Sequence, residues 1–366
     1  MIEIILTILL ISTTYAGTDL YVGYPGKNNN FNTVQEAVNK AASLGPSNEQ
    51  TRVTIHIAPG TYRQQVWVEV PYLTFVNDEP SKGDDKGYYD ANLAKQKSSK
   101  RQANYRWGAT VLLLPKAKYF KAKDMVFENS FNRYMTTEEI NDGVELLGDQ
   151  SVTKINIQRT SSLDVKSKAA TERGAALSAD TDHVEFLNCK FYGSQDTLYT
   201  GSSPLYFKNC LIEGQTDYIF GESNAVFDSC ELRWKGYSEG ALGGYITAAR
   251  ARGDPYTGYL FYNCKVTKNK SLTVKPGYFG RPWGQTAKVM FINTVLEDGN
   301  TIDNAGWYSM SGVQPETVDG FKEYGTKLTN GAAVNTSQRK GHILSQNDAQ
   351  GINIKNYLNS WTPSYM

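Results

Sequence analysis

The chain has 366 residues, of which 40% are hydrophobic and 20% are charged, and its formal net charge is +1. This composition is typical of a globular protein and excludes a disordered one. A net charge so close to zero gives no global field for nucleic acid or an anionic membrane, so we expect neither as a partner. The 24 Tyr and 32 Gly residues favour β structure.

The first 16 residues, MIEIILTILLISTTYA, contain an apolar run from Ile4 to Ile11. The run is too short to span a bilayer and is followed by small residues, as at a signal-peptide cleavage site. Glu3 precedes the run where a basic residue is usual, and a buried N-terminal strand is the alternative interpretation. We interpret residues 1–16 as a signal peptide and expect residues 17–366 to form a single secreted, extracellular domain.

Thr33 and Glu36 have the spacing of a capping box, in which two side chains bond backbone N–H groups at the start of a helix. The pattern predicts an amphipathic helix that continues to about Ala42, with Gly45 beyond its end. We expect this helix to cover one end of the fold. Residues 78–107 are rich in Lys, Asp, Gly and Ser, which predicts a long exposed loop.

A short pattern recurs through the middle of the chain: an aromatic residue, any residue, Asn or Ser, and then Cys, Ser or Thr. Copies begin at Phe127, Phe186, Phe207, Phe227, Phe261 and Phe291. A period near 20 residues with strand-like alternation predicts a parallel β-helix, in which equivalent residues of neighbouring coils form ladders. We expect the Phe side chains to stack in the core and the Asn side chains to hydrogen-bond along the axis. Residues 347–358 predict a weaker helix near the other end.

The cysteines are Cys189, Cys210, Cys230 and Cys264. None lies in a C-x-x-C pair, so the sequence predicts no zinc site. Cys189 and Cys210 occupy equivalent positions one coil apart, where the spacing suits either a disulfide bond or a reduced ladder. Asn269 and Asn335 each begin an N-glycosylation sequon, which permits modification if the host is eukaryotic and leaves open whether it occurs.

Two aspartates share one position in the repeat. Asp196 lies seven residues after Cys189, and Asp217 lies seven after Cys210. The β-helix register therefore places their backbones one inter-strand spacing apart. Two carboxylates so close resist joint ionisation, so one should hold its proton more tightly, and a nearby cation could keep the other ionised. Either Asp alone would be interpreted as a turn residue, but the pair predicts an acid and a nucleophile.

A third stretch follows these aspartates and reads Phe-Gly-Arg-Pro-Trp over residues 279–283. Arg281 is a candidate cation for the carboxylate pair. Trp283 offers a flat apolar face on which a sugar ring can stack. Taken alone, the stretch would equally suit a surface turn with a buried Trp.

In this order, the motifs GSQDTLY (193–199), DYIFG (217–221) and FGRPW (279–283) closely resemble those of the pectinesterase, or pectin methylesterase, family. The similarity extends through roughly residues 170–310 and includes residues 31–37 near the start. The resemblance implies an all-β, right-handed parallel β-helix with an N-terminal capping helix and a C-terminal tail packed on the coils. It also implies a monomeric hydrolase that demethylates pectin, releases methanol and needs no metal or organic cofactor.

Carried over motif by motif, the resemblance implies that Asp217 attacks the methyl-ester carbonyl of a galacturonate residue. Asp196 would first donate a proton to the leaving methanol and then act as the base that activates water. Arg281 would hydrogen-bond Asp217 and keep it ionised, and Gln195 would donate to the oxyanion. The implied substrate-binding residues are Trp283, Arg173, Phe220, Tyr218 and Trp307.

Arg173 departs from the family pattern, because it stands 22 residues before Gln195, where the family has a Gln that helps the oxyanion site. An arginine there could favour an oxyanion or a neighbouring free carboxylate, or it could perturb Asp196. This departure leaves two alternatives open, a glycan-binding β-helix without catalysis and an esterase for another ester. The two carboxylates leave a third, the hydrolysis of a glycosidic bond.

Overall fold

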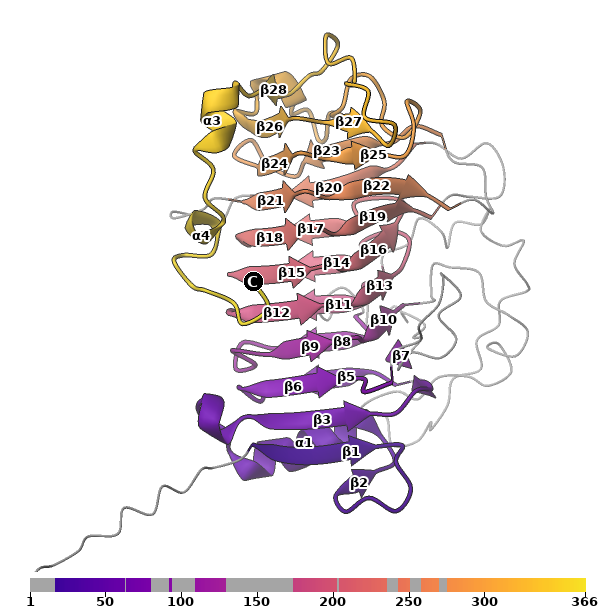
Figure 1. Ribbon diagram of the computed structural model, residues 1–366, viewed down its shortest axis with the longest axis vertical. Coiled ribbons are helices and arrows are strands. Elements are labelled where there is room, and N and C mark those ends of the chain that lie inside the picture. The colour runs from indigo at the N-terminus through magenta and orange to yellow at the C-terminus, as the bar shows by residue number, and fades with distance from the viewer. Residues whose placement is uncertain are drawn as a thin grey trace, which may run out of the picture.

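The computed structural model describes residues 17–62, 64–79, 92–93, 109–129, 174–202, 204–235, 243–250, 258–269 and 275–366. Within these residues the chain winds into a stack of coils whose sides are three sheets of parallel strands (Figure 1). The predicted signal peptide, most of the predicted loop 78–107 and Arg173 lie outside the described residues. Among the described segments, none of the helices has the length and apolar character that a membrane span requires.

The first sheet has 12 described strands, which are named here in their spatial order. They are β2 (Asn30–Phe31), β1 (Thr18–Val22), β3 (Val53–Ile57), β6 (Leu73–Val76), β9 (Lys121–Lys123), β12 (Val184–Leu187), β15 (Leu205–Lys208), β18 (Ala225–Asp228), β21 (Tyr259–Tyr262), β24 (Lys288–Ile292), β26 (Gly320–Tyr324) and β28 (His342–Ile343).

The second sheet, with nine described strands, follows the first around each coil. Its members are β27 (Lys327–Leu328), β25 (Val295–Leu296), β22 (Lys265–Lys268), β19 (Glu231–Trp234), β16 (Leu211–Gly214), β13 (Lys190–Tyr192), β10 (Val126–Glu128), β7 (Asn92–Leu93) and β4 (Thr61–Tyr62).

The third sheet, with seven described strands, completes the coil. It consists of β23 (Tyr278–Pro282), β20 (Tyr245–Ala249), β17 (Ile219–Gly221), β14 (Leu198–Thr200), β11 (Leu177–Ala179), β8 (Val111–Leu113) and β5 (Val66–Val68). Neighbouring strands in all three sheets pair in parallel, which confirms the predicted parallel β-helix.

A column of phenylalanine rings runs through the core of the stack. The rings of Phe186, Phe207, Phe227, Phe261 and Phe291 are stacked in that order, with centroids 4.3–4.9 Å apart. The prediction of stacked Phe residues is thus confirmed for five of its six copies. Phe127 was wrongly assigned to this column, because it lies in β10 of the second sheet and stacks on Phe191 instead.

Five strands of the first sheet, β12, β15, β18, β21 and β24, are each followed by a residue with a left-handed backbone. Asn188, Asn209, Ser229, Asn263 and Asn293 have φ between 52° and 55°. Asn and other short polar residues tolerate this conformation better than most non-glycine residues, which explains the repeat physically. The expected hydrogen bonds along the axis are a lesser feature, since Asn293 donates to the Asn263 side chain at 3.3 Å.

The cysteines form a reduced ladder in the core. All four are buried and unbridged. The thiols of Cys210, Cys230 and Cys264 each donate to a carbonyl oxygen of the preceding coil. Burial raises the pKa of these three thiols, so they stay protonated and can act as donors. The structure therefore favours the ladder over the disulfide bond.

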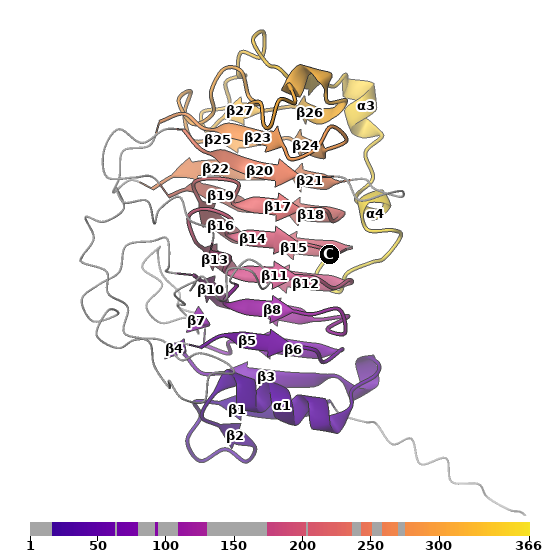
Figure 2. The same cartoon turned by 180° about the vertical axis from the view of Figure 1, so that it is seen from behind.

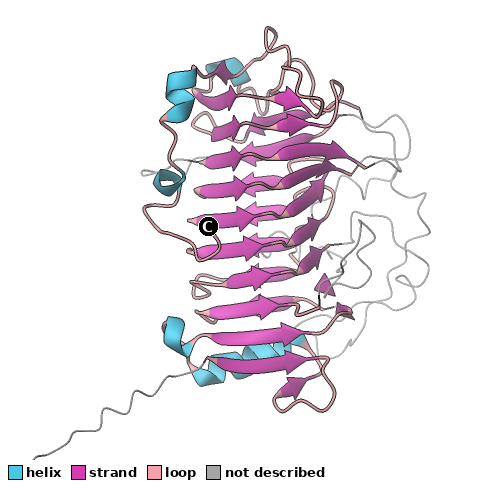
Figure 3. Ribbon diagram, viewed as in Figure 1, coloured by secondary structure: helices cyan, strands magenta, loops and turns pink. Residues whose placement is uncertain are grey.

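Helices cover the N-terminal coil and the outside of the first sheet (Figures 2 and 3). Helix α1 (Val34–Leu44) starts with the predicted capping box of Thr33 and Glu36 and ends at Gly45, whose φ is 61°. Its buried face packs on β1, β3 and β5. The short 3₁₀ helices η1 (Glu49–Thr51) and η5 (Pro315–Thr317) lie in connections.

The C-terminal tail packs on the outer face of the first sheet. It contains two short helices, α3 (Gln346–Gln350) and α4 (Ile354–Tyr357), instead of the one helix predicted over 347–358. Leu358 is fully buried against an outward-facing row formed by Tyr206, Val226, Leu260 and Ile292. At the far end of the tail, the Ser364 hydroxyl and the Tyr365 amide both donate to the Glu185 carboxylate in β12.

The left-handed position predicts a sharp difference between two variants of Asn209, whose φ is 52°. Glycine adopts this conformation freely, whereas a β-branched residue is strained there. We expect Asn209→Val to have a free energy of unfolding roughly 1–2 kcal/mol below that of Asn209→Gly. Urea unfolding of both variants, followed by circular dichroism, would measure the difference. Equal stability of the two variants would contradict this explanation of the repeat.

Candidate active site

Two aspartates lie side by side at the beginning of neighbouring strands in the third sheet. Asp196 precedes β14 and Asp217 precedes β17, each by two residues. Leu198 pairs with Ile219, and Gln195 forms a parallel bridge with Thr216. The two Asp residues therefore occupy the same position on successive coils, as their common spacing from the cysteines predicts.

Both aspartates also have a left-handed backbone, with φ of 62° at Asp196 and 49° at Asp217. In an unbroken strand, side chains three residues apart would point to opposite faces. The left-handed residue interrupts this alternation, so Asp217 and Phe220 both line a pocket on the outside of the sheet. Tyr218 and Ile219, which lie between them, point into the core. An aromatic wall is thereby placed beside the carboxylates.

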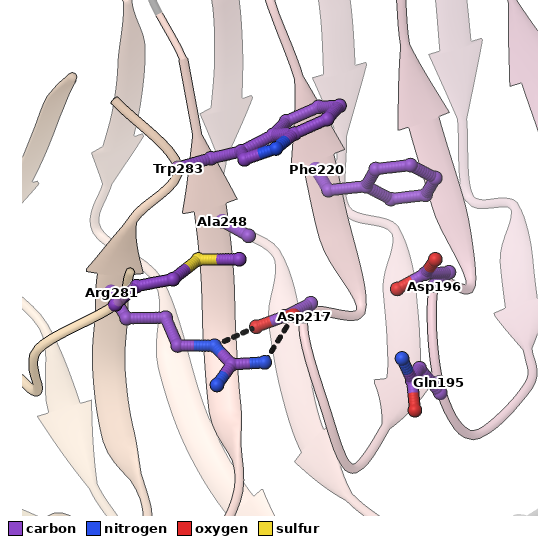
Figure 4. Close-up of a pocket in the computed structure, with 8 residues that line it drawn as sticks. Gln195, Asp196, Asp217, Phe220, Ala248, Arg281 and Trp283 are labelled. Atoms are coloured by element: carbon purple, nitrogen blue, oxygen red, sulfur yellow. Dashed lines mark hydrogen bonds and ion pairs between the residues drawn. The ribbon is translucent and has the colours of Figure 1, made fainter. Parts of the chain in front are cut away.

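The pocket gathers residues from five successive coils, and Figure 4 shows their side chains. It is lined by Gln195, Asp196, Asp217, Phe220, Ala248, Arg281, Trp283 and Met310. Six of these eight were predicted as site residues from the sequence. Ala248 and Met310 were missed, because no feature of the sequence marks a small residue in β20 or a methionine in the connection after β25 as part of a site.

Arg281 in β23 binds the Asp217 carboxylate through two nitrogens on one edge of its guanidinium group. Its Nε donates to Oδ1 of Asp217 at 2.8 Å, and its Nη2 donates to Oδ2 at 2.6 Å (Figure 4). Such two-point pairing fixes orientation as well as charge. Burial alone would lower the pKa of Arg281, but the hydrogen bonds and the negative charge of Asp217 raise it above its usual value. The pair therefore holds Asp217 as an oriented anion.

The two carboxylates have different environments. Asp196 and Asp217 are each only 5% exposed, so both depend on protein groups more than on water. Arg281 gives its two-point contact to Asp217, whereas Asp196 acts on Arg281 through its charge and more weakly. The guanidinium group of Arg281 thus stabilises the ionised form of one acid more than that of the other. This difference between the two acids is what a nucleophile and a proton donor require.

Two residues predicted to contact substrate lie elsewhere. Tyr218 is fully buried and meets Trp234 edge-on at 5.5 Å between centroids. Trp307 is also fully buried, and it stacks on Phe321 at 4.2 Å. Both predictions were wrong. Tyr218 points inward because it follows the left-handed Asp217, and Trp307 fills the core near the C-terminal end of the coil stack. Arg173, the remaining predicted residue, lies outside the described residues.

Comparisons with known proteins agree on one family. The pectinesterase family model matches residues 150–360. Pectinesterase 31 of Arabidopsis thaliana is 27% identical over 299 residues, covering 80% of this chain and 77% of that protein. Probable pectinesterase A of Neosartorya fischeri is 39% identical over 172 residues, which are 46% of this chain and 48% of that protein.

Solved structures show the same fold. The pectin methylesterase from Aspergillus niger aligns with a TM-score of 0.67 and 23% identity, covering 95% of this chain and 97% of that one. Pectin methylesterase PemA from Erwinia chrysanthemi aligns with a TM-score of 0.67 and 19% identity, covering 95% and 98%. These neighbours are right-handed parallel β-helices, in agreement with the predicted fold class. Because the family model covers more than half of the sequence, the chain belongs to the pectinesterase family.

Proposed function

We propose that the pocket on the third sheet is the site at which this pectinesterase hydrolyses the methyl esters of pectin, with Asp217 as nucleophile and Asp196 as general acid and base. Family membership makes the chain a carboxylic-ester hydrolase, which sets aside a non-catalytic glycan-binding protein and a glycosidase. The observation that carries the assignment of roles is the two-point contact of Arg281 with Asp217. Asp196, at the same position on the preceding coil, has no such contact with Arg281.

In the first step, an oxygen of the ionised Asp217 attacks the carbonyl carbon of the methyl ester. The carbonyl oxygen becomes an oxyanion, to which the Gln195 amide donates a hydrogen bond. Asp196 gives its proton to the departing methoxide, which leaves as methanol. The product of this step is an anhydride between Asp217 and the substrate carboxyl group.

In the second step, Asp196 takes a proton from a water molecule, whose oxygen attacks the substrate carbonyl of the anhydride. The bond to Asp217 breaks, Asp217 returns to its ionised form beside Arg281, and the free galacturonate acid is released. Asp196 ends the cycle protonated. Arg281 supports both halves because it stabilises the charge that Asp217 carries before attack and regains on release.

The pocket also suits the groups around the ester. Phe220, Ala248, Trp283 and Met310 give it apolar side chains on which a methyl group and the face of a sugar ring can rest. The site lies on the side of the coil stack, where a polymer can pass. A pectin methylesterase with the same fold has been solved in complex with a hexasaccharide, which supports a polysaccharide substrate here.

We further propose that residues 1–16 are a signal peptide and that residues 17–366 act as a single secreted, monomeric domain. The described part of the latter range forms one continuous stack of coils, beginning with β1 at Thr18. Arg173 remains a predicted contact for the oxyanion or for a free carboxylate of the polymer.

Replacement of Asp217 by Asn tests the proposed nucleophile while keeping the shape of the side chain. We expect methanol release from methyl-esterified pectin to fall by at least about 10³-fold, because the amide cannot form the anhydride. Thermal unfolding should stay cooperative, which would exclude a folding defect. Activity within tenfold of the wild type would reject Asp217 as the nucleophile.

The charge pair also predicts a pattern of stability. Arg281→Met leaves the buried Asp217 carboxylate without its counter-charge and hydrogen-bond donors, and we expect a loss of roughly 1–3 kcal/mol in the free energy of unfolding at pH 7. The double variant Asp217→Asn/Arg281→Met carries neither charge, so it should recover most of that loss. The loss in the single variant should shrink at pH 4, since the unpaired carboxylate can then take up a proton. Urea unfolding at both pH values would measure these effects, and a double variant no more stable than Arg281→Met would contradict them.

A further inference from the structure

Tyr245, the first residue of β20, lies on the coil that follows that of Asp217. Ile219 in β17 pairs with Thr247 in β20, and the Tyr245 amide donates to the carbonyl oxygen of Gln215, so Tyr245 lies beside the turn that carries Asp217, one coil on. Arg281 lies on the coil after that, where it pairs with Ala248. Three successive coils of the third sheet therefore carry Asp196, Asp217 and then an aromatic ring.

The guanidinium group of Arg281 lies over the face of this ring. Its central carbon is 4.1 Å from the centroid of Tyr245, within the range of a cation–π contact. A guanidinium stacked in this way keeps its N–H groups in its own plane, where they can still donate. Those N–H groups are the ones that reach Asp217. One face of Arg281 is thus occupied by an aromatic ring while its edge binds the carboxylate.

Tyr245 is itself held by other rings. It stacks on Tyr278 with centroids 5.7 Å apart and an interplanar angle of 21°, and Tyr308 lies 5.5 Å away. Tyr278 and Tyr308 also contact each other at 5.1 Å. Burial raises the pKa of the Tyr245 phenol, so the ring carries no charge at neutral pH. Arg281 therefore rests on a neutral ring that two further tyrosines keep in place.

We propose that Tyr245 is a positioning residue that holds the guanidinium group of Arg281 in the orientation from which it binds Asp217 at two points. This inference rests on the roles proposed above for the two acids. Arg281 reaches Asp217 across two coils, so its long side chain has other rotamers available unless one face of the guanidinium group is supported. Loss of the two-point contact would leave the Asp217 carboxylate less well oriented for attack. While Asp217 is part of the uncharged anhydride, the Tyr245 ring also keeps Arg281 in place, so that Arg281 can bind Asp217 again when its carboxylate is released.

Two variants separate the ring from the hydroxyl. Tyr245→Phe keeps the aromatic face, and we expect its kcat on methyl-esterified pectin to stay within about threefold of the wild type. Tyr245→Leu removes the face, and we expect kcat to fall roughly tenfold with a smaller change in KM, because orientation in the chemical step is lost. Tyr262→Leu, a half-buried tyrosine of β21 in the first sheet, is the control for a general loss of packing. Equal kcat values for Tyr245→Leu and Tyr245→Phe would overturn the proposal.

A double-mutant cycle tests whether Tyr245 acts through Arg281. In an Arg281→Lys background the flat guanidinium is absent, so Tyr245→Leu should lower kcat no further. The same tenfold fall in both backgrounds would mean that Tyr245 acts by another route and would overturn the proposal.

A readout without substrate separates this inference from the proposed function. The Nε–H of Arg281, observed by ¹⁵N NMR of the full chain, should exchange with water slowly in the wild type and Tyr245→Phe and faster in Tyr245→Leu. Equal exchange in all three would overturn the positioning role even if Asp217→Asn abolishes activity. An active Asp217→Asn would instead reject the proposed catalytic roles and leave the exchange result as the test of the contact.

Discussion

In the part of the chain that the structure describes, each coil is hydrogen-bonded to the next through parallel strands, and this ladder determines which side chains meet. Where the register is kept, equivalent residues are separated by about one inter-strand spacing of 4.8 Å. Phenylalanine rings then stack in the core, and thiols donate to the carbonyl oxygens of the preceding coil. The same translation brings Asp196 against Asp217, although two carboxylates at that distance repel each other. The hydrogen bonds between the strands keep the two aspartates adjacent despite the repulsion between their charges.

The site uses this enforced contact through two further features. Left-handed backbone at Asp217 turns Phe220 outward beside the two acids, which gives a polar pair an apolar neighbour. Arg281, two coils beyond Asp217, then makes the two acids unequal by binding one of them at two points. Repetition alone would produce two equivalent carboxylates. The departure from repetition, an arginine over an aromatic ring, makes the two acids unequal.

The sequence allowed the fold, the aspartate pair and Arg281 to be predicted, because a regular period converts spacing along the chain into position in space. The remainder depends on features that break the period. Tyr218 points inward because of the φ angle of Asp217, and that angle cannot be deduced from alternation. Met310 reaches the pocket from a connection outside the repeat, where no period applies. Phe127 matches the repeat by chance, and only the strand pairing places it in another sheet.

The C-terminal tail has a consequence for how the chain assembles. A solenoid can form coil by coil, since each repeat contacts mainly its neighbours. Here, however, the apolar row of Tyr206, Val226, Leu260 and Ile292 is covered by a segment that follows the last coil. During synthesis on the ribosome this row stays open to solvent until the tail emerges and Tyr365 reaches Glu185. Chaperone binding or aggregation therefore competes with folding in the interval after the coils have formed and before the tail has packed on them.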